Sequence, residues 1–230
     1  IGARSTAAVI DAAAVDTAGL SADQRRAVAA VAASPWLVQV LTAPAGAGKT
    51  TSLRALRAAA HAGEIGRVVV VAPTGRAVDV ALAEGAADTG ATVASALADL
   101  REGRWQLDAA TLLLVDEAGM VGTPALRELL AATTTAGVKT VLVGDAHQLA
   151  PVRSRGGMFA ELVADLPWAQ HLSQVWRMGD PGERDASLVI RDGAGAQLAA
   201  AVGWYRDAGR LHTGDPVTMA ADALTAWTAD

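Results

Sequence analysis

The stretch APAGAGKTT, at residues 43–51, combines small residues with one lysine and two hydroxyl side chains. It follows the apolar run WLVQVL and precedes SLRALRAAAH, which is typical of a helix, so it lies in the strand, turn and helix setting that a phosphate-binding loop requires. Small residues let successive backbone N–H groups surround phosphate oxygens, and the helix N-terminus adds partial positive charge. The residues that we expect to contact a nucleotide are Ala45, Gly46, Ala47, Gly48, Lys49, Thr50 and Thr51.

Two side chains of this loop have separate chemical roles. Lys49 is expected to reach the β- and γ-phosphates, and the Thr50 hydroxyl is expected to ligate Mg²⁺. The chain contains two lysines, Lys49 and Lys139, and otherwise uses arginine for positive charge, which indicates that a compact ammonium is needed in the loop. The pattern begins with Ala43 instead of glycine, and an ordinary glycine-rich turn is the alternative interpretation of the loop by itself.

A pair of carboxylates follows a second apolar run, in LLLVDEAGM at residues 112–120. Open parallel sheets bind ligands at the carboxyl ends of their strands, which is where this pair would lie. Asp116 would hold Mg²⁺ through its water shell, and Glu117 would orient and deprotonate the water that attacks the γ-phosphate. A solvated acidic strand end is the alternative for this motif alone, but the phosphate-loop pattern upstream favours the catalytic interpretation.

The composition excludes several classes of protein. The formal net charge of -5 provides no general attraction for nucleic acid, so any contact with DNA must come from local arginines. Cysteine is absent, which excludes a disulfide framework and fits a reducing compartment such as the cytoplasm. No stretch approaches the ~20 apolar residues of a membrane span, and the N-terminus lacks the pattern of a signal peptide. Because the sequence does not begin with methionine, we expect it to be a piece of a longer protein.

Apolar runs alternate with helical patterns, which predicts an α/β fold with a parallel sheet and helices on both faces. The expected strands are residues 37–43, 68–74, 111–118, 140–146 and 170–176. The expected helices are residues 21–34, 50–63, 75–85, 123–137 and 157–166. Beyond this point the pattern is helical without a further buried strand, so residues 1–177 are predicted to form the nucleotide-binding lobe and residues 178–230 a helical connection.

An ordered set of motifs surrounds these two sites: APTGRA (72–77), DEAGM (116–120), GDAHQLAPV (144–152) and VWR (175–177). The set resembles motifs Ia, II, III and IV of superfamily 1 helicases, and LSADQ (20–24) is similar to the glutamine motif that precedes the phosphate loop there. Within that superfamily the set is most similar to the 5′ to 3′ group that includes RecD-like enzymes and conjugative relaxase-helicases. Several details look most like the conjugative branch, namely DEAGMV, the GG of SRGGMF, ERDASLVIRDG and WYRDAGRLHTGD. The resemblance implies a RecA-like P-loop NTPase lobe that uses ATP and Mg²⁺. Its implied partners are single-stranded DNA, a second RecA-like lobe and a relaxase domain, with no membrane.

The resemblance also implies roles for single residues. Gln24 would read adenine, because a carboxamide can donate and accept at one base edge. Gln148 would couple the nucleotide state to the grip on the DNA strand. Arg177 would contact the γ-phosphate, since a guanidinium offers a fixed fork to phosphate oxygens. The family usually has glutamine after this arginine, whereas this chain has Met178.

Candidates for DNA contact are fewer. Thr74 and Arg76 in APTGRA resemble contacts that the family makes with the DNA backbone, although Arg76 is equally interpreted as a plain surface arginine. Arg153 and Arg155 form a small basic loop, for which a solvated loop is the alternative. The tryptophans next to expected strands, Trp36 among them, favour packing over base stacking.

The resemblance therefore implies the first motor lobe of a 5′ to 3′ DNA helicase, with an arginine finger supplied by a second lobe. One alternative is a nucleotide-dependent binding module, in which ATP controls partner docking and no DNA is moved. Another is a catalytically silent scaffold domain, against which the intact Lys49, Thr50, Asp116, Glu117 and Gln148 argue.

Overall fold

The computed structural model describes residues 1–230 except residues 12, 14, 64, 149–156 and 230. The chain divides into two compact units, Ile1–Val175 and Trp176–Asp230. The functional roles expected for residues 1–177 and 178–230 stay predictions.

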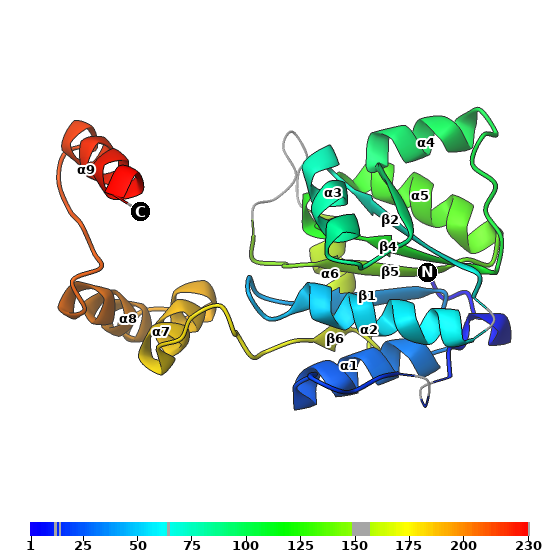
Figure 1. Cartoon of the computed structure of the whole chain (residues 1–230), viewed down its shortest axis with the longest axis horizontal. Coiled ribbons are helices and arrows are strands. Elements are labelled where there is room, and N and C mark those ends of the chain that lie inside the picture. Colours follow the sequence, from blue (N-terminus) through cyan, green and yellow to red (C-terminus); the bar gives the residue numbers. More distant parts are fainter. Residues whose placement is uncertain (12, 14, 64, 149–156, 230) are drawn as a thin grey trace. The chain divides into compact units, whose positions relative to one another are not determined.

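The first unit is built on a parallel sheet. Among the described residues it has six strands in the order β3-β2-β4-β5-β1-β6, and every pairing is parallel (Figure 1). The register sets Thr42 beside Gly144 and Val71 beside Val115, which aligns the carboxyl ends of the central strands. The loops that follow β1, β4 and β5 therefore meet at one edge of the sheet. The strands are β1 (Val38–Thr42), β2 (Arg67–Ala72), β3 (Thr89–Thr92), β4 (Thr111–Val115), β5 (Lys139–Gly144) and β6 (Gln170–His171).

Helices cover both faces of this sheet, because successive strand residues point to opposite sides. Leu112 and Leu114 of β4 pack in a cluster with α1 (Ala22–Ala33), α2 (Lys49–Ala62) and α3 (Gly75–Ala83). Leu113 and Val115 pack in a second cluster with α4 (Val93–Arg101), α5 (Thr123–Thr135) and α6 (Met158–Asp165). The α/β fold predicted from the sequence is therefore confirmed.

One strand and one helix escaped the sequence analysis, namely β3 and α4. The strand TGAT has no apolar run, because β3 lies at the edge of the sheet and its first residues are exposed. Gly90 permits α3 to pack closely on this edge, since a β-carbon there would lie 2.6 Å from Val78 Cγ1 and 2.9 Å from the Val70 carbonyl oxygen. The helix α4 starts directly after the strand, where the Thr92 hydroxyl accepts from Ser95 N.

The last strand is shorter than expected. Only Gln170 and His171 pair with β1, although Leu172 N still donates to Thr42 O at 2.9 Å. The amides of the next two residues, Ser173 and Gln174, donate to a carboxylate instead of a strand. The prediction of a strand over residues 170–176 was therefore wrong beyond the start of that segment.

Lys139, the second lysine of the chain, serves the fold. It is 1% exposed at the start of β5, and its Nζ donates to three carbonyl oxygens, those of Ala8, Ala32 and Ser34, at 2.8, 3.0 and 2.8 Å. These bonds tie the N-terminal segment and the end of α1 to the sheet. Burial lowers the pKa of Lys139 to about 7.

The second unit is helical, with α7 (Pro181–Asp192), α8 (Ala196–Asp207) and α9 (Pro216–Ala229), and no strand occurs among its described residues. Asp180 caps α7 by accepting from Gly182 N and Glu183 N, and α7 packs against α8. A β-carbon on Gly182 would lie 2.7 Å from Trp204 Nε1, so this contact needs glycine. Across the described part of the chain, no helix is both long and apolar enough to cross a membrane.

Candidate nucleotide-binding site

The loop between β1 and α2 bends through glycines with left-handed backbone. Gly46 has a φ of 80° and Gly48 a φ of 78°, a region that side-chain-bearing residues rarely adopt. Gly48 is also the N-cap of α2, and no described side chain caps this helix. The first N–H groups of α2 are therefore left for an anion, which the helix dipole also attracts. In this loop Ala45 is exposed, Ala47 is buried, and the remaining expected contact residues, Gly46, Gly48, Lys49, Thr50 and Thr51, are half-buried.

Gln24 supports the loop from the start of α1. Its Nε2 donates to Ala47 O at 3.0 Å and to Gly48 O at 3.5 Å, while its Oε1 accepts from Ser21 N at 2.9 Å. The side chain is 4% exposed, and a β-carbon on Gly48 would lie 2.2 Å from Nε2. The structure thus brings Gln24 to the nucleotide loop, with its amide bonded to protein groups. Its contact with adenine stays a prediction, which requires the amide to exchange some of these bonds.

Lys49 and Glu117 are brought together across the edge of the sheet. Lys49 begins α2, Glu117 follows β4, and Lys49 Nζ lies 3.2 Å from Glu117 Oε1. Glu117 has φ 49° and ψ 41°, and it is the one described residue other than glycine with a positive φ. This left-handed backbone costs roughly 1–2 kcal/mol, and such conformations cluster at functional sites.

Asp116 lies in the chain between the end of β4 and Glu117. Its backbone N donates to Val71 O at 2.9 Å, and its Oδ1 accepts from Glu117 N at 2.9 Å. Burial raises the pKa of the Asp116 carboxyl, and the charge of Lys49 opposes that shift. A desolvated carboxylate that is only partly compensated by a nearby ammonium gains from a further cation.

The turn after β4 packs tightly against the end of β5. A β-carbon on Gly144 would lie 3.1 Å from Gly119 N, and one on Gly119 would lie 3.0 Å from Asp145 O. Gln148 follows on the same edge of the sheet, with its backbone N donating to Asp145 O and its side chain exposed. The backbone contact thus holds the loops after β4 and β5 together, and the expected role of Gln148 stays a prediction.

The residues present fit a magnesium nucleotide. Two left-handed glycines and an uncapped helix N-terminus suit phosphate oxygens, and Lys49 supplies a cation beside them. Thr50 and Asp116 offer hydroxyl and carboxylate oxygens, the hard ligands that Mg²⁺ prefers. No group of three or more His, Cys, Asp or Glu that could hold a metal exists among the described residues. A Mg²⁺ ion here would therefore take its other ligands from phosphates and water, as it commonly does.

Two of the candidates for DNA contact, Thr74 and Arg76, follow β2 at the same edge of the sheet as this site. Thr74 caps α3 by accepting from Ala77 N at 3.3 Å, and Arg76 lies in the first turn of the same helix. Both side chains are exposed after β2, the strand next to β4. Arg153 and Arg155 lie outside the described residues. For Thr74, Arg76, Arg153 and Arg155 alike, contact with DNA stays a prediction.

The remaining residues named from the sequence are Arg177 and the tryptophans. Arg177 belongs to the second unit, and its contact with the γ-phosphate stays a prediction. Trp36 stacks on Trp168 with ring centroids 4.3 Å apart, and Arg4 lies over the Trp36 ring. Both rings are thus used in packing.

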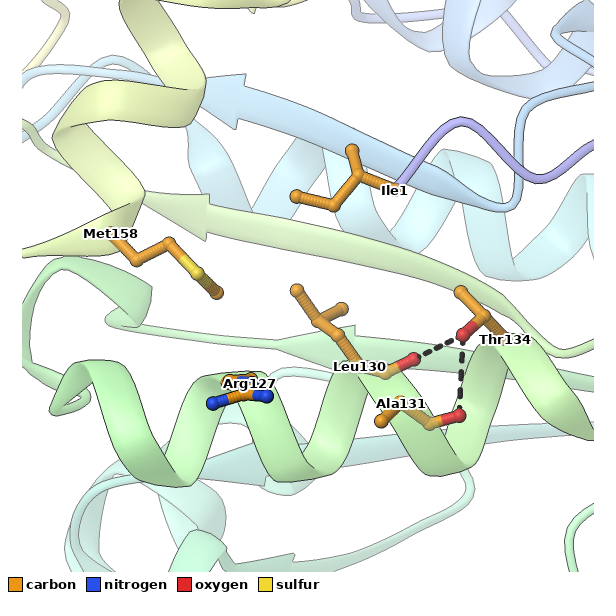
Figure 2. A pocket seen from close by; sticks show the side chains of 6 residues that line it. All are labelled: Ile1, Arg127, Leu130, Ala131, Thr134 and Met158. Atoms are coloured by element: carbon orange, nitrogen blue, oxygen red, sulfur yellow. Dashed lines mark hydrogen bonds between the residues drawn. The ribbon is translucent and has the colours of Figure 1, made fainter.

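A separate pocket of about 190 Å³ lies on the α5 and α6 side of the sheet (Figure 2). Its lining is largely apolar, and the Thr134 hydroxyl donates to Leu130 O and Ala131 O within α5. Arg127 of α5 contributes a charged side chain to the lining, which also includes Ile1 and Met158. This pocket offers no set of groups for a triphosphate, so the candidate site remains the edge formed by the glycine loop and the two carboxylates.

Sequence reasoning missed Asp23, which the structure places beside this site. The Asp23 carboxylate is 4% exposed and accepts from Gln24 N, Ser173 N and Gln174 N. The position of Asp23 in the first turn of a helix was recognisable from the sequence, since acids are common there. Its bonds to Ser173 and Gln174 could not be recognised, because these residues are distant in the sequence.

Comparison with known proteins agrees with the motifs. Residues 19–216 match the AAA domain family. Over 192 residues the chain is 35% identical to a probable conjugal transfer protein TraA of Sinorhizobium fredii. The aligned region covers 84% of this chain and 17% of that protein. Over 174 residues it is 34% identical to the conjugal transfer protein TraA of Agrobacterium fabrum, covering 76% of this chain and 15% of that protein. The chain thus spans less than a fifth of the length of these relatives.

A solved structure has a similar fold. The Pif1 helicase from Candida albicans superposes with a TM-score of 0.60 over 85% of this chain and 48% of that chain, at 22% identity. Together with the sheet order, this likeness shows a RecA-like fold for the first unit.

Proposed function

From the premise that this chain belongs to the AAA domain family, in the superfamily 1 group of RecD-like and relaxase-helicase motors, we propose that it is the ATP-hydrolysing first motor lobe of a 5′ to 3′ DNA helicase. Residues 1–177 form the lobe in this proposal, and residues 178–230 lead toward a second RecA-like lobe. A relaxase domain belongs to the same polypeptide, which acts in the cytoplasm during conjugative transfer. The names of the TraA relatives support this context.

The observation that carries the proposal is the 3.2 Å contact between Lys49 Nζ and Glu117 Oε1 beside the glycine loop. It brings the cation expected at the β- and γ-phosphates next to the carboxylate expected to activate water. Without nucleotide the two charges neutralise each other. When the phosphates of ATP attract the Lys49 ammonium, the Glu117 carboxylate is released to accept a proton from the attacking water.

Thr50 and Asp116 are the residues that would hold Mg²⁺, which when bound neutralises charge on the β- and γ-phosphate oxygens. The raised pKa of Asp116 indicates that its buried charge is incompletely compensated without a further cation. Gln24 supports the loop through its amide and reads adenine in the bound state. Arg177 adds positive charge to the γ-phosphate in the assembled motor.

For the DNA strand, we propose that Thr74 and Arg76 contact backbone phosphates. Both are exposed at the start of α3, where the Arg76 guanidinium is open to solvent. Gln148 lies on the same edge of the sheet, in a loop packed against the turn that carries Glu117. Its exposed side chain is therefore suited to transmit the nucleotide state to a bound strand.

A second candidate function is ATP-controlled docking of a partner without movement of DNA. It is favoured by the apolar residues that α9 exposes, with Val217 at 79%, Leu224 at 61% and Trp227 at 76%. Large exposed apolar side chains are typical of interaction surfaces. The two functions differ in whether DNA changes the rate of ATP hydrolysis.

The test compares ATP hydrolysis, with and without single-stranded DNA, by this chain and by a protein extended through the second lobe. An arginine finger contributes on the order of 10³ to 10⁵ in rate, so the chain alone should hydrolyse ATP very slowly and the extended protein should show DNA-stimulated turnover. Nucleotide binding without any DNA stimulation in the extended protein would favour the docking function. Strong DNA-stimulated hydrolysis by the chain alone, independent of its concentration, would refute the need for a second lobe.

A further inference from the structure

Asp23 is a buried carboxylate that bonds to two separate parts of the first unit. Its Oδ1 accepts from Ser21 Oγ and from Gln24 N, both in the cap of α1. Its Oδ2 accepts from Ser173 N at 3.0 Å and from Gln174 N at 3.1 Å, with Ser173 Oγ at 3.5 Å. With the side chain 4% exposed, these bonds hold a charge that is nearly withdrawn from water.

The pKa of the Asp23 carboxyl agrees with these hydrogen bonds. Burial by itself raises the pKa of Asp23, but the hydrogen bonds from Ser21, Ser173, Gln174 and Gln24 outweigh it, and the pKa lies below its ordinary value. The carboxylate is therefore ionised at neutral pH. Its bonds to backbone N–H groups are charge-assisted, which makes each stronger than a neutral bond.

Residues 172–175 form the segment by which the chain leaves the sheet, and we call them the exit segment. Leu172 N donates to Thr42 O at the end of β1, and the next two amides donate to Asp23. Val175 is buried at 2% exposure, and the second unit begins directly after it. Asp23 thus takes the place of a neighbouring strand for this segment and fixes its backbone.

The residue next to Asp23 contacts the phosphate loop. Gln24 Nε2 donates to Ala47 O and Gly48 O. Two adjacent residues of α1 therefore bind the phosphate loop on one side and the exit segment on the other. Arg177 follows Val175 by two residues, a reach of at most about 7 Å along an extended chain.

We propose that Asp23 is a positioning residue, which fixes the exit segment relative to the phosphate loop so that Arg177 is delivered to ATP during hydrolysis. The proposal rests on the function proposed above for Arg177. The α1 cap then has two roles in the motor, because Gln24 supports the nucleotide loop and Asp23 directs the chain toward the arginine.

A double-mutant cycle in the full-length protein tests this proposal. Steady-state ATP hydrolysis in the presence of single-stranded DNA is measured for wild type, Asp23→Ala, Arg177→Ala and the double variant. Asp23→Ala should lower kcat by about tenfold or more, because it removes two charge-assisted bonds, with KM for ATP changed by less than about twofold. The double variant should be no slower than Arg177→Ala within about twofold. A purely structural loss would instead add to the effect of Arg177→Ala.

Ser21→Ala is the matched control. It removes the Ser21 Oγ bonds to Asp23 Oδ1 and to Gln24 N but leaves the backbone bond from Ser21 N to Gln24 Oε1 and the Oδ2 bonds to the exit segment, so kcat should stay within about twofold of wild type. If Asp23→Ala does not fold, Asp23→Asn takes its place in the cycle. Amide hydrogen exchange at Ser173 and Gln174 then gives a second readout, and exchange in Asp23→Asn should be faster by about tenfold or more.

The outcomes separate this proposal from the proposed function. Hydrolysis that persists in Lys49→Ala would contradict the ATPase site itself. Loss of hydrolysis in Lys49→Ala, with kcat unchanged in Asp23→Ala and Asp23→Asn, would overturn the positioning role alone. Additive effects of Asp23→Ala and Arg177→Ala, or an Arg177→Ala variant as fast as wild type, would overturn it as well.

Discussion

Replacing Gly48 with alanine should destabilise the first unit through two separate effects. The residue has φ 78° and ψ 36°, and a left-handed backbone costs a residue with a β-carbon roughly 1–2 kcal/mol. The new methyl group would also lie 2.2 Å from Gln24 Nε2, so the Gln24 amide must move away from Ala47 O. That hydrogen bond is worth about 1 kcal/mol, which brings the expected loss to about 2–3 kcal/mol.

Gly19 offers a control for the backbone effect. Its φ is 75°, and a β-carbon there would meet no atom within 4 Å, so Gly19→Ala should cost only the roughly 1–2 kcal/mol of the left-handed backbone. The free energy of unfolding is measured by urea titration, with amide hydrogen exchange in the buried strands β1, β4 and β5 reporting on the first unit. In a Gln24→Ala background, Gly48→Ala should cost no more than Gly19→Ala. A Gly48→Ala loss equal to that of Gly19→Ala in the wild-type background would refute the contact between Gln24 and the loop.

Three further predictions concern the carboxylates and the buried lysine. Glu117→Gln in the extended protein should bind ATP while single-turnover hydrolysis collapses, and near wild-type turnover would exclude Glu117 as the base. Asp116→Asn should bind ADP with the same affinity in Mg²⁺ and in EDTA, whereas a retained Mg²⁺ dependence in calorimetry would contradict its metal role. Because the pKa of Lys139 is about 7 in the folded chain and about 10.4 when unfolded, the unfolded state binds more protons between these values. The free energy of unfolding should therefore rise from pH 7 to pH 9 in wild type more than in Lys139→Met, and equal pH profiles from urea titrations would contradict this.

Those parts of the fold with a local signal could be predicted from the sequence. The valine and leucine runs of β1, β4 and β5 are buried on every residue, so they read as strands of a parallel sheet. The phosphate loop and the Asp116 and Glu117 pair follow two of these strands directly. Because parallel strands end at one edge, the sequence order alone indicated that these groups would meet.

Features that depend on distant partners could not be predicted. The strand β3 has no apolar run, since it lies at the sheet edge, and Gly90 is needed because Val78 of α3 and Val70 of β2 pack so close to it. Asp23 bonds to residues 150 positions further along the chain, which no local pattern records. The left-handed backbone falls on Glu117, which carries a side chain, whereas the glycine of the same turn is Gly119, so the sequence did not mark this conformation.

Calorimetric titration of the folded 230-residue chain with Mg-ADP tests the central claim most directly. Wild type should release heat at one site, Lys49→Ala should release none while its circular dichroism stays unchanged, and Arg54→Ala, an exposed cation on the same helix, should bind as wild type does. A folded wild-type chain that gives no heat of binding, or equal binding by Lys49→Ala, would contradict the assignment of this edge of the sheet as a nucleotide site.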